Sequence, residues 1–213
     1  MIKKNGRDLY IYKGIINYSA SRKLIKFDEE IEKIIIKSNF DFDDNLAPHF
    51  SEYLYLKEFE IGNKATYFEV YDGILYMRLN EESCNGSNNI YLNCYSPLFY
   101  GSPKGLVLLS CPKCIKEKDI VIHQDCTIIY GSAFAGCDLN SLLIPDSFTE
   151  ALPAAFTDVT IKKLIVPNKL KVWVEDSHSN VNKDIAVECT GGDDISKSMI
   201  CRWWKEKVTG DYK

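Results

Sequence analysis

The cysteines are the residues of this sequence whose spacing could carry chemistry. The 213-residue chain contains eight of them. Cys111 and Cys114 form a C-x-x-C pair, and His123 and Cys126 follow with the same separation. Thiolates and imidazoles at such spacing bind zinc, and a structural zinc site takes four of them. No second C-x-x-C pair occurs. A zinc site or thiol-dependent active site is therefore one hypothesis, and a turn at a strand end is the interpretation that we prefer.

Three other patterns could carry chemistry, and each has a simpler explanation. A nucleophilic Cys–His pair would need His49, His123 or His178, but no known cysteine-hydrolase signature accompanies them. Glu58 and Glu60 alternate along one predicted strand, so they share a face as an acid–base pair or, as we favour, a solvated or partner-facing strip. The turn TGGDD at 190–194 resembles an anion site, but its two aspartates oppose an anion. We therefore expect no catalytic residue, no cofactor, no metal and no enzymatic activity.

Composition narrows the class of protein. Hydrophobic residues make up 46% of the chain and charged residues 26%, as in an ordinary globular protein. The net charge of −4 argues against a nucleic-acid-binding role, which usually needs a basic face. No apolar run reaches about 18 residues, so we expect no membrane span. No signal peptide is recognised, which predicts a cytoplasmic protein; the cell surface or secretion is the alternative if a leader has been removed.

A sequence repeat organises the second half of the chain. Ala133-Phe134 recurs as Ala155-Phe156, and Ile144-Pro145 recurs as Val166-Pro167, each 22 positions later. Leu142 and Leu164 keep the same phase. A period between about 20 and 29 is typical of leucine-rich repeats, in which each coil supplies one strand and buries its apolar face only by stacking on its neighbours. Cys126 and Cys137 fall on core positions of this pattern, so we expect reduced thiols there instead of disulfides.

The repeat resembles a known family. The stretch IVIHQDCTIIYGSAFAGCDLNSLLIP is similar to the BspA-like leucine-rich repeat, in which A-F-x-x-C is followed by L-x-x-I-x-I-P. The residues on this pattern are Ile122, Cys126, Ile129, Ala133, Phe134, Cys137, Leu139, Leu142, Ile144 and Pro145, whereas His123 replaces the first proline of the family. The segment EIGNKATYFEVYDGILY also resembles a hairpin that interrupts the coils in such proteins. The resemblance implies a right-handed solenoid with a concave β-sheet, and a binding role without enzymatic activity.

We therefore predict an α/β, mostly β, leucine-rich-repeat solenoid or horseshoe that forms a single domain over residues 1–213. Degenerate coils would occupy 1–56, and BspA-like repeats 57–170, with a loop inserted at 80–103. The cap would be 171–213, where the apolar spacing of DDISKSMICRWWKEKV predicts an amphipathic helix at about 194–208. Such a helix would cover the core face that the last coil exposes.

The repeat also predicts a binding surface. Side chains alternate along a strand, so the residues between the inward ones face the open, concave side. These residues are Glu58, Glu60, Asp119, Val121, Ser141, Leu143, Lys163 and Ile165. Val121, Leu143 and Ile165 would form an apolar ladder, although β-branched residues also simply favour strands. We expect a module that binds a protein partner through the concave sheet, with self-association possible. The alternative is a thiol- or zinc-dependent enzyme or regulator at Cys111, Cys114, His123 and Cys126.

Overall fold

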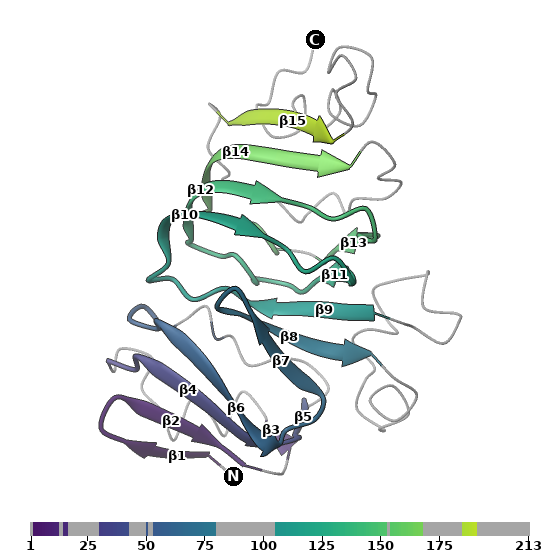
Figure 1. The fold of residues 1–213 in the computed structure, drawn as a ribbon. Helices are drawn as coiled ribbons and strands as arrows, with labels where there is room; N and C mark the ends of the chain where they lie inside the picture. Colours follow the sequence, from purple (N-terminus) through teal and green to yellow (C-terminus); the bar gives the residue numbers. More distant parts are fainter. Residues whose placement is uncertain are drawn as a thin grey trace. The chain divides into compact units, whose positions relative to one another are not determined.

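The computed structural model describes residues 2–12, 15–16, 30–42, 50, 53–79, 105–152, 154–167 and 185–190 of the 213-residue chain. The chain divides into two compact units, Met1–Cys114 and Ile115–Lys213. The regular elements of the described residues are all β-strands (Figure 1). The predicted, mostly β architecture is therefore confirmed for this part of the chain.

Parallel strands form the first layer of the first unit. Strands β2 (Asp8–Ile11), β4 (Lys33–Ser38) and β6 (Glu58–Lys64) lie side by side in parallel. Leu9 aligns with Ile34, and Ile34 with Phe59, so equivalent positions in successive coils recur every 25 positions. These three side chains are buried. A second pair of short parallel strands, β3 (Ile15–Ile16) and β5 (Asp41–Phe42), repeats with a similar spacing.

An antiparallel strand ends this sheet. Strand β1 (Ile2–Asn5) pairs with β2 across a two-residue loop of Gly6 and Arg7. Gly6 has a φ of 60°, which glycine adopts without strain and which the first loop residue of a type II′ turn requires. Lys3, Lys4 and Asn5 are exposed on β1. Charged side chains on an edge strand oppose the addition of a further strand.

A three-stranded antiparallel meander completes the described part of the first unit. It contains β7 (Phe68–Tyr71), β8 (Ile74–Leu79) and β9 (Gly105–Ser110). Asp72 and Gly73 join β7 to β8 with φ angles of 52° and 79°, as a type I′ hairpin turn requires. This is the hairpin predicted from the sequence. The predicted loop at 80–103 lies outside the described residues.

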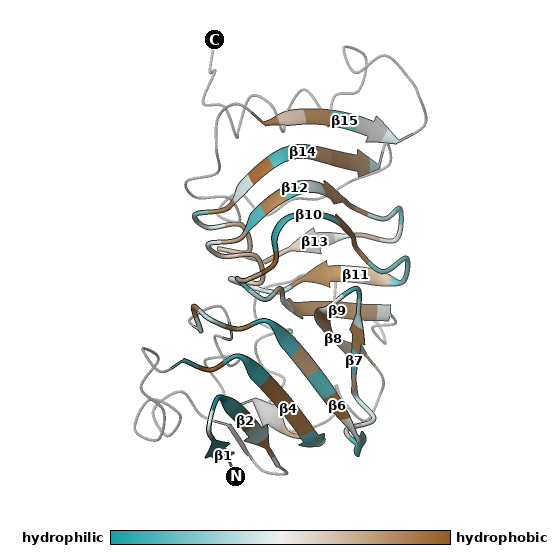
Figure 2. Cartoon of the chain, turned by 60° about the vertical axis from the view of Figure 1, so that its left-hand side comes forward, coloured by the Kyte–Doolittle hydropathy of each residue, from teal (hydrophilic) through white to brown (hydrophobic). Residues whose placement is uncertain are grey.

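The second unit is a regular stack of coils. Strands β10 (Lys116–Val121), β12 (Asp138–Leu143), β14 (Thr160–Pro167) and β15 (Ala186–Thr190) form one parallel sheet. Strands β11 (Cys126–Ile129) and β13 (Glu150–Ala151) pair in parallel on another wall of the coils. Figure 2 shows hydrophilic residues at the start of β10 and hydrophobic residues at its end. Ile120, Leu142 and Leu164 align in successive strands, which confirms the predicted period.

Two stacked phenylalanines fill the interior of these coils. Phe134 and Phe156 are fully buried, and their nearly parallel rings lie 5.4 Å apart between centroids. The backbone joins the same coils, because the amide of Phe134 donates to the carbonyl of Ala155 at 2.9 Å. Cys126 and Cys137 are also buried, and Cys111, Cys114, Cys126 and Cys137 are all free thiols. The core positions predicted from the repeat are therefore confirmed.

The carboxyl-terminal part of the chain differs from the prediction. Strand β15 lies within 171–213, where a cap is predicted, and it aligns Val187 with Leu164, 23 positions earlier in the sequence. The coils therefore continue beyond residue 170. The predicted capping helix at about 194–208 lies outside the described residues, and the part of the chain that is described contains no helix to support it. The single domain over 1–213 stays a prediction.

We expect Phe134→Ala and Phe156→Ala each to lower the free energy of unfolding by about 3–5 kcal/mol, because each removes a fully buried ring and leaves a cavity. Chemical denaturation measures the loss. Gln124→Ala, at an exposed turn position, is the control and should change stability little. A loss below about 1 kcal/mol for both phenylalanine variants would contradict the core assignment.

Candidate protein-interaction surface

Six of the predicted binding residues lie on one face of one sheet. Asp119, Ser141 and Lys163 are register partners on β10, β12 and β14, and so are Val121, Leu143 and Ile165. The residues between them point inward and are buried, as Ile120, Leu142 and Leu164 show. We call these six outward residues the ladder face. The sequence predicted this register, which follows from alternation along strands that repeat with one period.

The ladder face has an apolar row. Val121 is 46% exposed, and Leu143 and Ile165 are half-buried beside it. On the next strand Glu188 aligns with Ile165, so the row ends at a carboxylate. Neighbouring strands lie about 4.8 Å apart, which makes the three side chains one continuous strip. Contiguous apolar surface of this kind often marks an interaction site.

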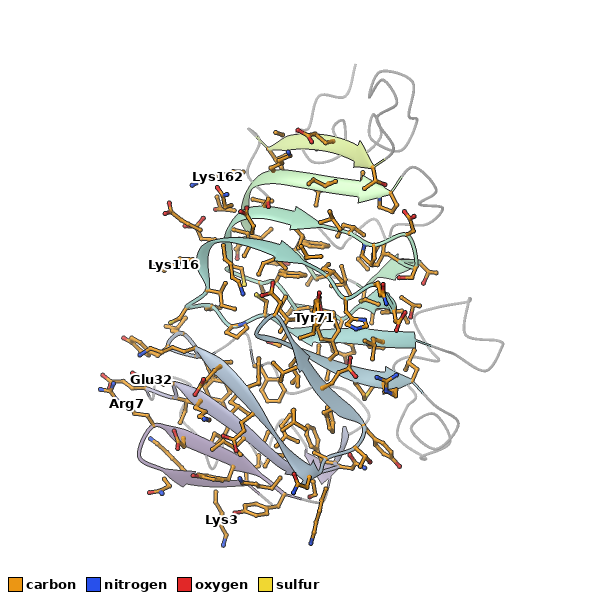
Figure 3. The ribbon with its side chains drawn as sticks, in the orientation of Figure 1. Lys3, Arg7, Glu32, Tyr71, Lys116 and Lys162 are labelled. Carbon is orange, nitrogen blue, oxygen red and sulfur yellow. The ribbon has the colours of Figure 1, made fainter. Side chains whose placement is uncertain are left out.

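The second row of the ladder face is polar and ordered by hydrogen bonds. The carboxylate Oδ1 of Asp119 accepts hydrogen bonds from Oγ of Ser141 at 2.6 Å and from Nδ2 of Asn140 at 2.8 Å. The Ser141 hydrogen bond, supported by Asn140 and by the charge of Lys163, lowers the pKa of Asp119 against the opposing effect of burial. Lys163 itself forms an ion pair with Glu188 at 2.9 Å. Figure 3 shows Lys162 beside the same sheet, where it pairs with Glu117 at 3.3 Å.

Glu58 and Glu60 do not join the ladder face. Both lie on β6, in a different sheet from the other six predicted residues. Lys33 on the adjacent strand bridges them, with Nζ 3.0 Å from Glu58 and 2.9 Å from Glu60. The hydrogen bond with Glu60 is the largest cause that raises the pKa of Lys33, and the hydrogen bond with Glu58 is the next largest. In turn, the hydrogen bond from Lys33 lowers the pKa of Glu60. A carboxylate held ionised in this way is a poor general acid, so the geometry favours an internal ion-pair network.

A related network occupies the strand starts of the first unit. Arg7 pairs with Glu30 and Glu32, and Lys57 pairs with Glu32 at 2.9 Å. The hydrogen bond from Lys57 is the main cause that lowers the pKa of Glu32, and Arg7 adds to it. Figure 3 shows Arg7 and Glu32 side by side. Arg7, Glu32 and Lys57 lie 25 positions apart in the sequence, a signal that becomes visible only when charges are compared by strand register and not by segment.

The thiol and histidine candidates occupy turns and core positions. The thiol of buried Cys126 donates to the carbonyl of Ile128 at 3.3 Å, and that of Cys114 donates to the carbonyl of Leu54 at 3.5 Å. Cys111 is buried. Nδ1 of His123 accepts the backbone N–H of Asp125 at 3.1 Å, as expected of a turn. Within the described ranges no three His, Cys, Asp or Glu residues form a metal-binding group.

The remaining chemical candidates, His49, His178 and residues 191–194, lie outside the described residues. In the part of the chain that is described, no helix is long and apolar enough to cross a membrane.

Stacked parallel strands with a buried residue repeating every 22 positions define a leucine-rich-repeat fold. A family model described as "BspA type Leucine rich repeat region" matches residues 110–199 in six copies, so this segment is similar to BspA-type repeats. The resemblance seen in the sequence is thereby confirmed. The match covers less than half of the chain, includes β15 and leaves out the β7–β8 hairpin.

One solved structure is similar to this chain. It is a leucine rich cell surface protein from Faecalibacterium prausnitzii A2-165, with 12% sequence identity and a TM-score of 0.28. The alignment covers 80% of this chain and 54% of that one, so this chain spans about half the length of that protein. The family match, and not this distant likeness, supports the repeat assignment. No curated protein matches the sequence.

We expect Ser141→Ala to raise the pKa of Asp119 toward the ordinary aspartate value, because the hydroxyl is the main group that stabilises the ionised form. Because folding lowers this pKa, its contribution to stability is present above the pKa of the unfolded chain and is lost as the pH falls through the folded value. Carboxyl ¹³C NMR titration measures the shift. Ser147→Ala, whose hydroxyl donates to the carbonyls of Gln124 and Cys126, is the control. An unchanged Asp119 titration would contradict the hydrogen bond.

We expect Lys33→Met to raise the pKa of Glu60, because it removes the nearer of the two ammonium groups that contact this carboxylate. Lys37→Met should have a smaller effect, since Lys37 lies 3.6 Å from Glu60 and is a weaker cause of the shift. The same NMR titration compares the two variants. Equal shifts, or a larger one from Lys37→Met, would show that Lys33 does not bridge the β6 carboxylates.

Proposed function

We propose that this chain is a non-catalytic protein-interaction module and that the ladder face binds the partner. The observation that carries the proposal is the apolar row of Val121, Leu143 and Ile165 on the outward side of a regular parallel sheet. The BspA-type repeat region supports it, because stacked repeats provide extended surfaces for binding. We leave Glu58 and Glu60 out of the surface, because Lys33 already pairs with both.

The two rows would have different tasks in binding. Burial of the apolar row removes hydrocarbon surface from water, and this supplies affinity in proportion to the area covered. The polar row is held in place by the Ser141–Asp119 hydrogen bond and the Lys163–Glu188 pair. Such fixed groups orient a partner and discriminate between partners more than they add affinity. The proposed partner is therefore a protein with an apolar strip of matching length.

The location of the protein is a separate question. The cytoplasmic location predicted from the sequence has no support in the fold or in the comparisons. A cell-surface location is the alternative that the BspA-like resemblance favours. Labelling of intact host cells with a membrane-impermeant reagent distinguishes the two, because only a surface protein is labelled.

The test replaces Val121, Leu143 and Ile165 together with Thr, a β-branched residue that favours strands, and so removes the apolar strip. We expect the variant to fold, by circular dichroism, and to lose the partner that the wild-type chain captures from the native host. The control is Leu54→Ser with Val70→Thr, which removes exposed apolar side chains elsewhere. Equal capture by the wild-type chain and the folded triple variant would exclude the ladder face as the binding surface.

A further inference from the structure

We infer that the ladder face also fits the ladder face of a second copy of this chain, in a two-fold dimer whose axis runs along β12. This inference rests on the proposed function, because it uses the same surface. In a two-fold interface both copies use the same patch, so the patch must be complementary to itself. If residue i of one copy contacts residue j of the other, then residue j of the first copy also contacts residue i of the second. The order of charges across β10, β12 and β14 meets this requirement.

The polar row shows the complementarity. It runs from a carboxylate, Asp119, through neutral Ser141 to an ammonium group, Lys163, on consecutive strands. Rotation by half a turn about an axis along β12 exchanges the positions of β10 and β14 and places β12 opposite its own counterpart. Asp119 of one copy then faces Lys163 of the other, and the same pair forms a second time by symmetry. Two opposite-charge contacts therefore result from one rotation.

The apolar row obeys the same rotation. Val121 meets Ile165 of the second copy twice, and Leu143 meets its own counterpart on the axis. Sheets that pack face to face lie about 10 Å apart with nearly aligned strands, which this arrangement allows. A two-fold axis along the stacking direction instead reverses the strands and places β10 against β10 of the second copy, so neither Asp119–Lys163 contact forms. The chemistry of the two rows therefore selects the axis along β12.

A second pair of charges repeats the order. Glu117 precedes Asp119 on β10, and Lys162 precedes Lys163 on β14. Nζ of Lys162 lies 3.3 Å from the carboxylate of Glu117, so these two charges already pair within one chain. Negative charge on the first strand and positive charge on the third thus occur twice.

The polar groups keep bonding capacity for a second copy. Both hydrogen bonds to Asp119 end on Oδ1, and among the described residues none ends on Oδ2. The ammonium group of Lys163 has three N–H donors and, among the residues that the structure describes, forms an ion pair with Glu188 alone. The dimer contact between Oδ2 and this ammonium group therefore adds a charge-assisted hydrogen bond without breaking those within the chain.

The size of the face sets the strength of association. Three strands of about six residues cover roughly 20 Å by 15 Å, or about 300 Å² on each copy. Standard stable interfaces bury about 800 Å² per partner, so we expect a weak dimer with a dissociation constant on the order of 10⁻⁴ M. Such a dimer is visible by sedimentation equilibrium at concentrations up to about 1 mM.

Charge reversal provides the test. Asp119→Lys creates two Lys–Lys contacts in its homodimer, and Lys163→Asp creates two Asp–Asp contacts, so each variant alone should associate more weakly than the wild-type chain, with a dissociation constant raised at least about tenfold. A mixture of the two variants forms only opposite-charge contacts. We therefore expect the mixture to associate as strongly as the wild-type chain. Neither a defect in folding nor a charge pair within one chain produces this recovery on mixing.

Asp146→Lys, a charge reversal at an exposed turn of the same unit, is the control and should dimerise like the wild-type chain. Leu143→Lys is a second route to the monomer, because it places two ammonium groups on the axis. A wild-type chain that stays monomeric at about 1 mM, or mixed variants that do not associate, overturns the dimer. Partner capture by the wild-type chain and its loss in the triple variant are unaffected by these results, so failure of the dimer is distinguishable from failure of the proposed function.

Discussion

The rest of the structure depends on one constraint, which is the lateral pairing of each coil with the next in a fixed register. A single coil of this length cannot bury its own apolar side chains, so Ile120, Leu142 and Leu164 are shielded only because the strands align them. The backbone amides also form hydrogen bonds along the stacking direction, as the bond from the N–H of Phe134 to the carbonyl of Ala155 shows. A shift of one residue between strands would turn the buried side chains toward solvent. The register that buries the core therefore also determines which side chains form the outward surface.

The same constraint operates in both units with different periods and opposite results for their outward faces. In the first unit the register brings Lys33 between Glu58 and Glu60, and Arg7 and Lys57 onto Glu32. In these contacts charge meets opposite charge within one chain. In the second unit the register aligns Val121, Leu143 and Ile165, whose apolar surface no neighbouring strand of their sheet can cover. Both faces are built from stacked coils. They differ because the register aligns opposite charges in the first unit and apolar side chains in the second, and only the second gives a candidate binding face.

The period of the second unit could be predicted because it repeats identical residues, Ala-Phe and a proline, at positions where few other residues fit. The ladder face followed from it, since alternation assigns every second residue to the outside. The longer period of the first unit was missed, because Leu9, Ile34 and Phe59 are apolar but different, and any strand pattern would contain them. The pairing of Glu58 and Glu60 with Lys33 was missed for the same reason, since partners across strands are known only once the register is known. Strand β15 was missed because its coil is one residue longer than the preceding ones.

The cysteines show how periodicity distinguishes packing from chemistry. Judged by local spacing, Cys111, Cys114, His123 and Cys126 suggest metal ligands. Judged by phase, Cys126 occupies the position that Phe148 occupies one coil later, and both side chains are buried. A thiol that replaces a phenylalanine in a repeated core position contributes as a small hydrophobic group with a weak donor, and its hydrogen bond to the carbonyl of Ile128 satisfies that donor locally. In a repeat protein the phase of a residue is therefore stronger evidence about its role than its spacing from nearby residues of the same type, because stacking acts on every coil alike.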